Sequence, residues 1–267
     1  MNSSLLSIGT LQIDRVTMRQ ALQRIASLVH HSWGGYVVTP NVDHVVLAER
    51  DERLREAYRR ANLSLADGMP LVWMSRLLGA PLPERVAGSD LFEPLMALAA
   101  REGWPVFFVG STEANSAEAC RRLTLQHPGL RIAGRDTGRW NPDGAEPAES
   151  AAVTRAIRES AARLVIVALG CPKQELWMAH HADALRPAVA LGLGGVLDFT
   201  SGAVGRAPHW MRRSGLEWAY RLLQEPGRLA HRYLVQDMQV LPIFARQLWR
   251  GAEQPESGPA TASRVPE

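Results

Sequence analysis

Short apolar runs alternate with longer amphipathic stretches along most of the chain. Each run is too short for a helix but has the length of a buried strand. Amphipathic stretches with helical spacing separate the runs, and this order is typical of βαβ units and a mostly parallel sheet. The runs that we expect to form strands are 35–39, 63–66, 106–109, 164–169 and 189–193.

The stretches between these runs carry signals for helix starts. Pro70 suits the first turn of a helix, and the hydroxyl of Ser89 can cap a helix that begins at Asp90. The helices that we expect are 42–60, 70–78, 90–101, 115–126, 151–160 and 174–184. The two patterns together predict an α/β fold.

The pattern changes after about residue 201, where the strand-like runs stop. Segment 205–250 interleaves basic and aromatic residues, which is typical of short helices on a peripheral membrane surface. A helical layer packed on the core, with a solvated basic face, would have the same composition. The basic residues are Arg206, Arg212, Arg213, Arg221, Arg228, Arg232, Arg246 and Arg250, and the aromatic residues are Trp210, Trp218, Tyr220, Tyr233, Phe244 and Trp249.

These shifts in composition divide the chain into a core at 1–204, a basic helical appendage at 205–250 and a tail at 251–267. The tail is small, polar and proline-bearing, so we expect it to be disordered. The N-terminus lacks the features of a signal peptide, and no apolar run approaches the roughly 20 residues that span a bilayer. We therefore expect a cytoplasmic protein whose membrane contact is peripheral.

Composition changes this picture only slightly. The formal net charge is +3, and Lys173 is the one lysine among many arginines. Arginine suits phosphate, although its enrichment also follows genome composition. Cys120 and Cys171 do not make a disulfide framework, and both fit a reducing compartment.

Polar residues follow the expected strands, where an open parallel sheet binds ligands. Thr39 and Asn41 offer a hydroxyl and an amide to a hydroxyl-rich or nucleotide ligand, although Asn41 could equally cap a helix. Asp67 could take a proton from an attacking hydroxyl or could cap the next helix. Arg85 could pair with a phosphate or a carboxylate, or it could be an ordinary surface arginine.

Two further strand ends carry glycines and polar side chains. Gly170 shapes a turn, and Lys173 and Gln174 stand where a helix N-terminus can meet an anion or a sugar. After the last strand Gly194 permits close backbone approach, and Asp198 is available to a ribose. This stretch lacks the third glycine of the dinucleotide fingerprint.

Several other signatures are absent from the sequence. We find no G-x-S-x-G, no Walker loop, no metal-ligating cluster of cysteine and histidine, and no D-x-D. We therefore expect neither a metal nor a cofactor.

The ordered set of motifs resembles the WecG/TagA/CpsF glycosyltransferase family. The resemblance covers about residues 35–235, and each motif is weak alone whereas the ordered set is highly specific. It implies a Rossmann-like core with helices on both faces of the sheet. The matching segments are TPNVDH, LADGMP, ERVAGSDL, FFVGS, GCPKQE, GLGGVLDFTSG, RAP and GLEW.

The same resemblance implies an activity. Members of the family transfer a sugar, with inversion, from a UDP-sugar to a polyprenyl-diphosphate-linked sugar in surface polysaccharide or teichoic acid assembly. Asp67 matches the position of the proposed catalytic base. Thr39, Asn41, Arg85 and Gln174 match positions proposed to contact substrate.

The resemblance also implies that the basic appendage closes over the site and reaches the membrane, which would place the protein on the inner face of the plasma membrane. Arg206, Arg221 and Arg228 are our candidates for binding the diphosphate. The confinement of these arginines to one appendage argues against nucleic acid, and a homo-oligomer is left open. The alternatives are a nucleotide-binding module without transferase activity and a Rossmann-type oxidoreductase.

Overall fold

The computed structural model describes residues 5–138, 148–213, 215–224 and 226–253, with the backbone alone for 148–150, 209, 213, 228 and 250–253. Its strands are β1 (Leu5–Ile8), β2 (Leu11–Asp14), β3 (Gly35–Val38), β4 (Leu63–Ser64), β5 (Pro105–Gly110), β6 (Arg131–Asp136), β7 (Leu164–Ala168) and β8 (Val189–Gly192). The helices of the core are α1 (Met18–His30), α2 (Val42–Arg50), α3 (Glu52–Arg60), α4 (Met69–Leu77), α5 (Gly88–Glu102), α6 (Glu113–Gln126), α7 (Ala148–Glu159), α8 (Lys173–His181) and α9 (Val196–Ser201). Those of the appendage are α10 (His209–Arg213), α11 (Glu217–Gln224), α12 (Pro226–His231), the π-helix η1 (Arg232–Gln236), the 3-10 helix η2 (Asp237–Gln239) and α13 (Val240–Glu253).

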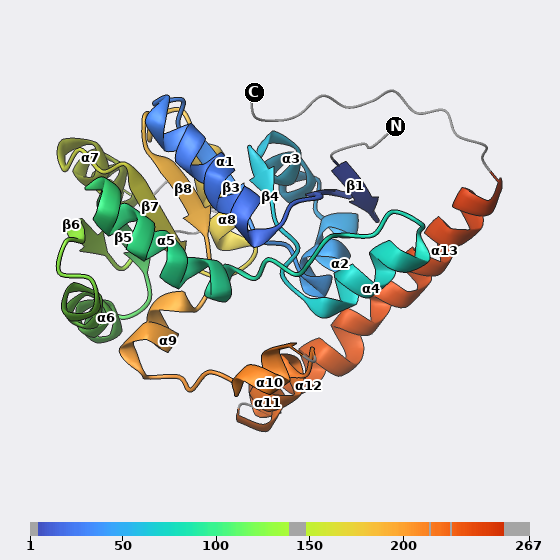
Figure 1. Cartoon of the computed structure of the whole chain (residues 1–267). Coiled ribbons are helices and arrows are strands. Elements are labelled where there is room, and N and C mark those ends of the chain that lie inside the picture. The colour runs from blue at the N-terminus through green and yellow to red at the C-terminus, as the bar shows by residue number, and fades with distance from the viewer. Residues whose placement is uncertain (1–4, 139–147, 214, 225, 254–267) are drawn as a thin grey trace.

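One parallel sheet forms the centre of the molecule, with its strands in the order β4-β3-β8-β7-β5-β6 (Figure 1). Strands β1 and β2 pair separately as an antiparallel hairpin. Because all strands of the central sheet are parallel, their carboxyl ends meet at one edge. The expected α/β fold with a mostly parallel sheet is confirmed.

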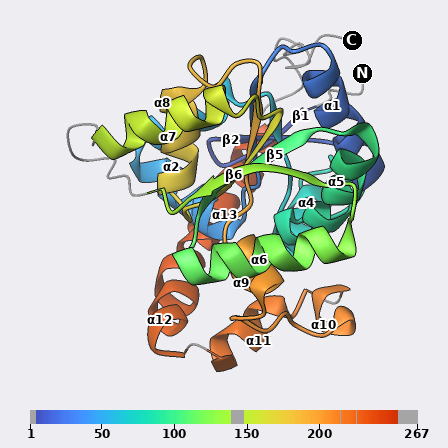
Figure 2. The same ribbon diagram turned by 90° about the vertical axis from the view of Figure 1, so that its left-hand side faces the viewer.

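Helices cover both faces of this sheet (Figure 2). Alternate residues along a strand point to opposite faces. Val37 and Ile166 pack with α1, α5 and α6, whereas Val38 and Val167 pack with α2, α3, α7 and α8. Burial on both sides explains why these strands appear in the sequence as continuous apolar runs.

The expected helix 42–60 is wrong as a single element. Asp51 ends α2, and its carboxylate then caps α3 by accepting the N–H of Arg53 at 2.9 Å and that of Leu54 at 3.3 Å. An aspartate favours a cap over a helix interior because its short side chain competes for backbone N–H groups. A single residue therefore divides the helix in two.

The cap expected at Ser89 is also wrong. Helix α5 begins at Gly88 with Ala87 as its N-cap and no side-chain cap hydrogen bond, while Ser89 Oγ accepts from the guanidinium of Arg206. All of the expected strands are present as β3, β4, β5, β7 and β8. The elements that the sequence did not predict are β1, β2, α1, β6 and α9.

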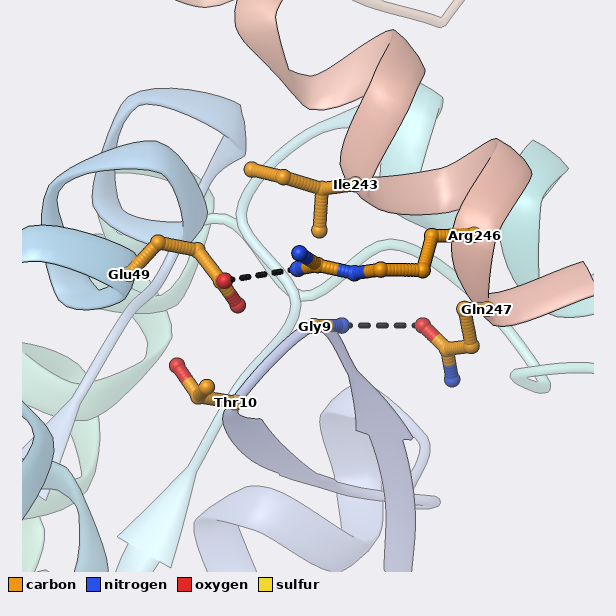
Figure 3. Close-up of a pocket in the computed structure, with 6 residues that line it drawn as sticks. All are labelled: Gly9, Thr10, Glu49, Ile243, Arg246 and Gln247. Carbon is orange, nitrogen blue, oxygen red and sulfur yellow. Dashed lines mark hydrogen bonds and ion pairs between the residues drawn. The ribbon is translucent and has the colours of Figure 1, made fainter. Parts of the chain in front are cut away.

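Helix α13 ties the appendage back to the core, where it packs on α2 (Figure 1). Figure 3 shows its contact with the β1–β2 turn, where Gln247 Oε1 accepts the N–H of Gly9 at 2.9 Å. The Gln247 amide also donates to the carbonyl of Ser7 at 2.7 Å. Arg246 pairs with Glu49 at 2.8 Å, and a cavity of about 300 Å³ lies beside these side chains.

Helix α13 continues to Glu253, past the boundary expected at residue 250. Residues 254–267 lie outside the described residues, so the disorder of the tail stays a prediction. In the part of the chain that the structure describes, every helix is too short or too polar to cross a bilayer.

Candidate active site

The loops at the carboxyl edge of the sheet carry most of the predicted site residues. Thr39 directly follows β3, and its hydroxyl donates to the carbonyl of Gly192 in β8 at 2.8 Å. A Cβ on Gly88 would come within 3.3 Å of Thr39 Oγ1, so the first turn of α5 lies directly against this hydroxyl. Thr39 thus joins β3, β8 and α5 at one point.

The sequence left helix capping open as an alternative role for Asn41 and for Asp67, and the structure confirms it only for Asn41. Asn41 is the N-cap of α2, and its Oδ1 accepts the N–H of Asp43 at 3.0 Å. Asp67 does not cap the helix that follows it, because the N-cap of α4 is Gly68 and no side chain bonds there. The side chain of Asp67 is therefore available for another role.

Asp67 is half-buried in the loop after β4. Its backbone N–H donates to the carbonyl of Pro40 at 2.8 Å, and its Oδ2 accepts the N–H of Gly88 at 3.2 Å. Burial raises the pKa of Asp67 to about 6, while the nearby Arg85 guanidinium lowers it and Glu217 raises it. The carboxylate is therefore ionised at neutral pH and is a stronger base than an ordinary aspartate.

Three guanidiniums gather on the carboxylate of Asp90, one from the core and two from the appendage. Arg85 pairs with Oδ2, whereas Arg206 and Arg212 approach Oδ1 at 2.7 Å and 2.5 Å. Arg85 also pairs with Glu217 of α11 at 3.2 Å. The side chain of Arg85 is only 12% exposed, so the surface alternative for it is wrong. These guanidiniums could make charge-assisted hydrogen bonds to an anion.

Gln174 is buried at the start of α8, beside the exposed Lys173. Its Oε1 accepts the N–H of Gly194 at 3.1 Å, and its Nε2 donates to Glu175 Oε1 at 2.8 Å. Gly170 precedes this helix with φ +75°, a conformation that glycine adopts without a steric penalty. The loops after β7 and β8 are joined through Gln174.

Asp198 belongs to a second group around α9. Its Oδ1 accepts from Ser111 Oγ at 2.5 Å and from Asn115 Nδ2 at 2.9 Å, which lie after β5 and in the first turn of α6. The guanidinium carbon of Arg221 lies 5.8 Å from the ring centre of Phe199, also in α9. This group lies at the end of β5 rather than around Asp67.

Two of the predicted diphosphate ligands have unused donors. The Nε groups of Arg206 and Arg221 are buried without a hydrogen-bond partner among the described residues. Arg228 lies in α12, but its side chain is outside the described residues. Arg206 also lines a hollow of about 280 Å³ between α5, α6 and α9, whereas none of the predicted site residues lines the cavity at α13.

A buried cluster that the sequence did not predict lies beneath the site. One ligand atom each from His44, Cys171 and Glu175 lies within 4.8 Å of the others. Burial lowers the pKa of His44 to about 3, raises that of Glu175 to about 7, and raises that of Cys171 well above its ordinary value. A divalent metal would require deprotonation of the thiol and the carboxyl.

Comparison with known proteins places the chain in a family. A model of the "Glycosyl transferase WecG/TagA/CpsF family" matches residues 6–254. The chain belongs to the WecG/TagA/CpsF glycosyltransferase family. A relative from Bacillus spizizenii, an "N-acetylglucosaminyldiphosphoundecaprenol N-acetyl-beta-D-mannosaminyltransferase", is 38% identical over 195 residues, which is 73% of each chain.

Membership of the WecG/TagA/CpsF family makes this protein a glycosyltransferase. The resemblance that the motifs carried is thereby confirmed over nearly the whole chain. The two alternatives, a nucleotide-binding module without transferase activity and an oxidoreductase, are set aside. The roles of individual side chains remain proposals.

Sequence reasoning missed several residues of this glycosyltransferase's site. Asp90, Arg212 and Glu217 come from distant segments, so only the fold brings them together. Glu175 follows Gln174 directly, yet its complete burial leaves no sequence signal. His44 did have one, because Asn41 and His44 have the spacing of a capping box.

Proposed function

We propose that this glycosyltransferase transfers a sugar from a UDP-sugar to a polyprenyl-diphosphate-linked sugar, with inversion, in the assembly of a bacterial surface polysaccharide or teichoic acid. The name of the Bacillus spizizenii relative makes N-acetylmannosamine and N-acetylglucosaminyl-diphosphoundecaprenol the first donor sugar and acceptor to test. That name specifies a β product. Inversion yields a β linkage when the donor carries its nucleotide in the α configuration.

The observation that carries this proposal is the environment of Asp67. Its carboxylate is held by the Gly88 N–H, its pKa is raised to about 6, and the guanidinium of Arg85 lies nearby. A general base works best with a pKa close to the working pH. Thr39 and Asn41, which begin the neighbouring loop, are the side chains that we expect to contact the donor.

The reaction is a single displacement. Asp67 accepts the proton of the acceptor hydroxyl as that oxygen attacks the anomeric carbon from the face opposite UDP. The new carbon–oxygen bond forms while the bond between the anomeric carbon and the phosphate oxygen breaks, and UDP leaves with the electron pair. Arg85 and the N–H groups at the start of α8 stabilise the charge that develops on the leaving diphosphate.

The other predicted residues divide between the two substrates. Gln174 and Gly194 frame the sugar, Gly170 and Lys173 form the turn that faces it, and Asp198 binds the ribose. The unpartnered Nε groups of Arg206 and Arg221 favour these arginines as ligands of the acceptor diphosphate. Arg228 completes this set on the evidence of its sequence position alone.

We also propose that the appendage rests on the membrane that holds the acceptor, on the cytoplasmic side. It exposes apolar side chains beside arginines, a combination that suits an anionic lipid surface. The exposed apolar side chains are Trp210, Trp218, Leu223, Leu234, Val235, Met238, Leu241 and Trp249, and all of them except Trp218 are at least half exposed.

The test is acceptor-dependent release of UDP by the purified full chain. A panel of UDP-sugars is supplied with and without a short-chain lipid-diphosphate-sugar, and the product is identified by mass spectrometry. Release with one donor, only when the acceptor is present, supports the proposal. Folded protein that binds no UDP and turns over no donor would contradict it. The variant Asp67→Asn, which we expect to keep UDP binding but lose transfer, serves as the control.

A further inference from the structure

A chain of polar groups, interrupted by one gap, runs beneath the proposed donor site. At one end the N–H of Asn41 lies 2.9 Å from His44 Nδ1, and at the other Gln174 Oε1 accepts the N–H of Gly194 at 3.1 Å. Gln174 Nε2 donates to Glu175 Oε1 at 2.8 Å. The remaining link is the 3.7 Å separation of His44 Nε2 and Glu175 Oε1. The chain spans the ends of β3, β7 and β8.

The central link has unused hydrogen-bonding capacity. His44 Nε2 and Glu175 Oε2 are buried and have no hydrogen-bond partner among the described residues. The side chains are 7% and 0% exposed, so bulk water does not reach them freely. Unpaired polar atoms of this kind are rare in protein interiors. The two side chains are therefore placed to bond to each other once the gap narrows by less than an ångström.

The position of one proton decides the direction of this bond, because when Nδ1 accepts from Asn41 the proton lies on Nε2, which can then donate to Glu175 Oε1. Nδ1 of His44 can accept the Asn41 N–H, or it can carry a proton and donate to Asn41 Oδ1 at 2.8 Å. In the second case the Nε2 lone pair faces Glu175, and a protonated carboxyl can donate to it. Both residues are then uncharged, which burial favours.

We propose that His44 and Glu175 are positioning residues that hold Asn41 and Gln174 at a fixed separation, and so determine how tightly the sugar nucleotide binds. This rests on the proposed function, in which Asn41 and Gln174 contact the donor. His44 and Glu175 do not touch the substrate and act only through these two neighbours. The Cys171 thiol hydrogen-bonds to the Glu175 carboxyl, and Tyr58 lies close to the pair.

Two substitutions at Glu175 distinguish a positioning role from an effect of the carboxylate charge and from an effect of packing. Glu175→Gln keeps the length of the side chain, and its amide oxygen can accept both from Gln174 and from the Nε2–H of His44. Glu175→Asp keeps the carboxyl but withdraws it by about 1.5 Å, the length of one carbon–carbon bond. The bridge therefore survives in the first variant and is broken in the second.

The measurements are the Kd for UDP by calorimetry and the KM and kcat for transfer. We expect Glu175→Gln to bind UDP within about threefold of the wild type, and Glu175→Asp to raise Kd and KM by about tenfold or more with a smaller change in kcat. Equal values in both variants, or loss in Glu175→Gln with retention in Glu175→Asp, would overturn the proposal. In the last case the carboxylate charge itself would be what matters.

A second variant keeps the test decisive if Glu175→Asp does not fold. His44→Phe retains a ring but removes both nitrogens, so it should weaken UDP binding as Glu175→Asp does. Unchanged UDP binding in folded His44→Phe would refute the role of the pair.

Failure of the proposed function would have a different signature. If the wild-type chain binds no UDP, the proposed function is contradicted. The positioning role of His44 and Glu175 is then not what has been tested. In that event coupling between His44→Phe and Glu175→Asp, each of which breaks the bridge, still reports in thermal unfolding whether the bridge exists. Additive losses of stability would contradict the bridge whatever the substrate is.

Discussion

The raised pKa of Asp67 links its proposed chemistry to the stability of the fold. An ordinary aspartate titrates near 3.8, whereas burial moves Asp67 to about 6. The folded chain therefore binds this proton more tightly than the unfolded chain does. Stability consequently falls as the pH rises from about 4 to about 6, and above that window the full cost remains.

Replacing Asp67 by Asn should abolish transfer and stabilise the protein. Above pH 6 the amide avoids the cost of burying a charge, so we expect the free energy of unfolding to rise by about 1 to 3 kcal/mol. Urea unfolding at pH 5 and pH 8 measures this, and the gain should be larger at pH 8. Asp183→Asn, at an exposed carboxyl, is the matched control. A stability loss at pH 8 would contradict the assigned environment.

The same carboxyl should govern the pH dependence of the reaction. Because protonation of Asp67 removes the base, kcat/KM should fall about tenfold per pH unit below about pH 6 and level off above it. A pH profile of acceptor-dependent UDP release records this limb. A rate that stays level from pH 7 down to pH 5 would exclude Asp67 as the base.

Thr39 offers a test of how the strand ends are held together. Thr39→Val keeps the shape of the side chain but leaves the Gly192 carbonyl without its 2.8 Å donor, so we expect a loss of about 1 to 3 kcal/mol in urea unfolding. Thr39→Ser retains the hydroxyl and serves as the control, with a smaller loss. Equal losses in both variants would show that the methyl group, and not the hydrogen bond, holds this junction.

At the scale of elements, buried strands were predictable and marginal ones were not. Strands β7 and β8 are apolar on both faces, so their runs are continuous in the sequence. Strand β6 is mostly polar and lies at the sheet edge, where a strand needs less apolar surface. Helix α1 did carry a signal, because Thr17 and Gln20 have the spacing of a capping box and form one.

Some residues of the candidate site could likewise be predicted from the sequence, and others could not. Thr39, Asp67 and Gln174 could be found because each follows a strand, and the fold fixes where strands end. The distant partner of Arg85 could not be found. Asp90 follows Arg85 by only five positions, but Glu217 lies 132 positions further along the chain, and nothing local predicts that it meets Arg85.

Helix α13 should loosen if its contact with the β1–β2 turn is removed. Gln247→Ala deletes the bonds to Gly9 and Ser7, so we expect faster amide hydrogen exchange in α13 with little change in the core strands. Arg186→Ala, at an exposed arginine of the core, is the control. Unchanged exchange in α13 would mean that packing on α2 alone fixes this helix.

For the whole molecule, the uneven placement of apolar surface is the feature with the clearest consequence. The appendage exposes Leu223 and Trp249 by 81% and 71%, while the core exposes Leu125 by 69% on α6. Single exposed apolar residues are ordinary, but a group of them beside arginines indicates a binding surface. Most of the exposed large apolar side chains among the described residues lie in the appendage, although α4 of the core also exposes Trp73 and Leu77 beside Arg76.

Replacing Leu223 and Trp249 together by Gln should weaken binding to anionic vesicles by about tenfold or more, since each apolar side chain buried in lipid contributes roughly 1.5 to 3 kcal/mol. Cosedimentation with vesicles containing or lacking anionic phospholipid measures this. Leu125→Gln should bind as the wild type does. Equal weakening by Leu125→Gln would mean that the contact is not specific to the appendage.

The exposed position of Lys173 has a practical consequence. It is the chain's one lysine, and it stands beside the buried Gln174 at the mouth of the proposed donor site. Apart from the N-terminal amine, an amine-selective reagent therefore has a single target. Its rate of acylation, followed by mass spectrometry, would report the occupancy of that site directly, with no engineered label and no need to know which sugar is bound.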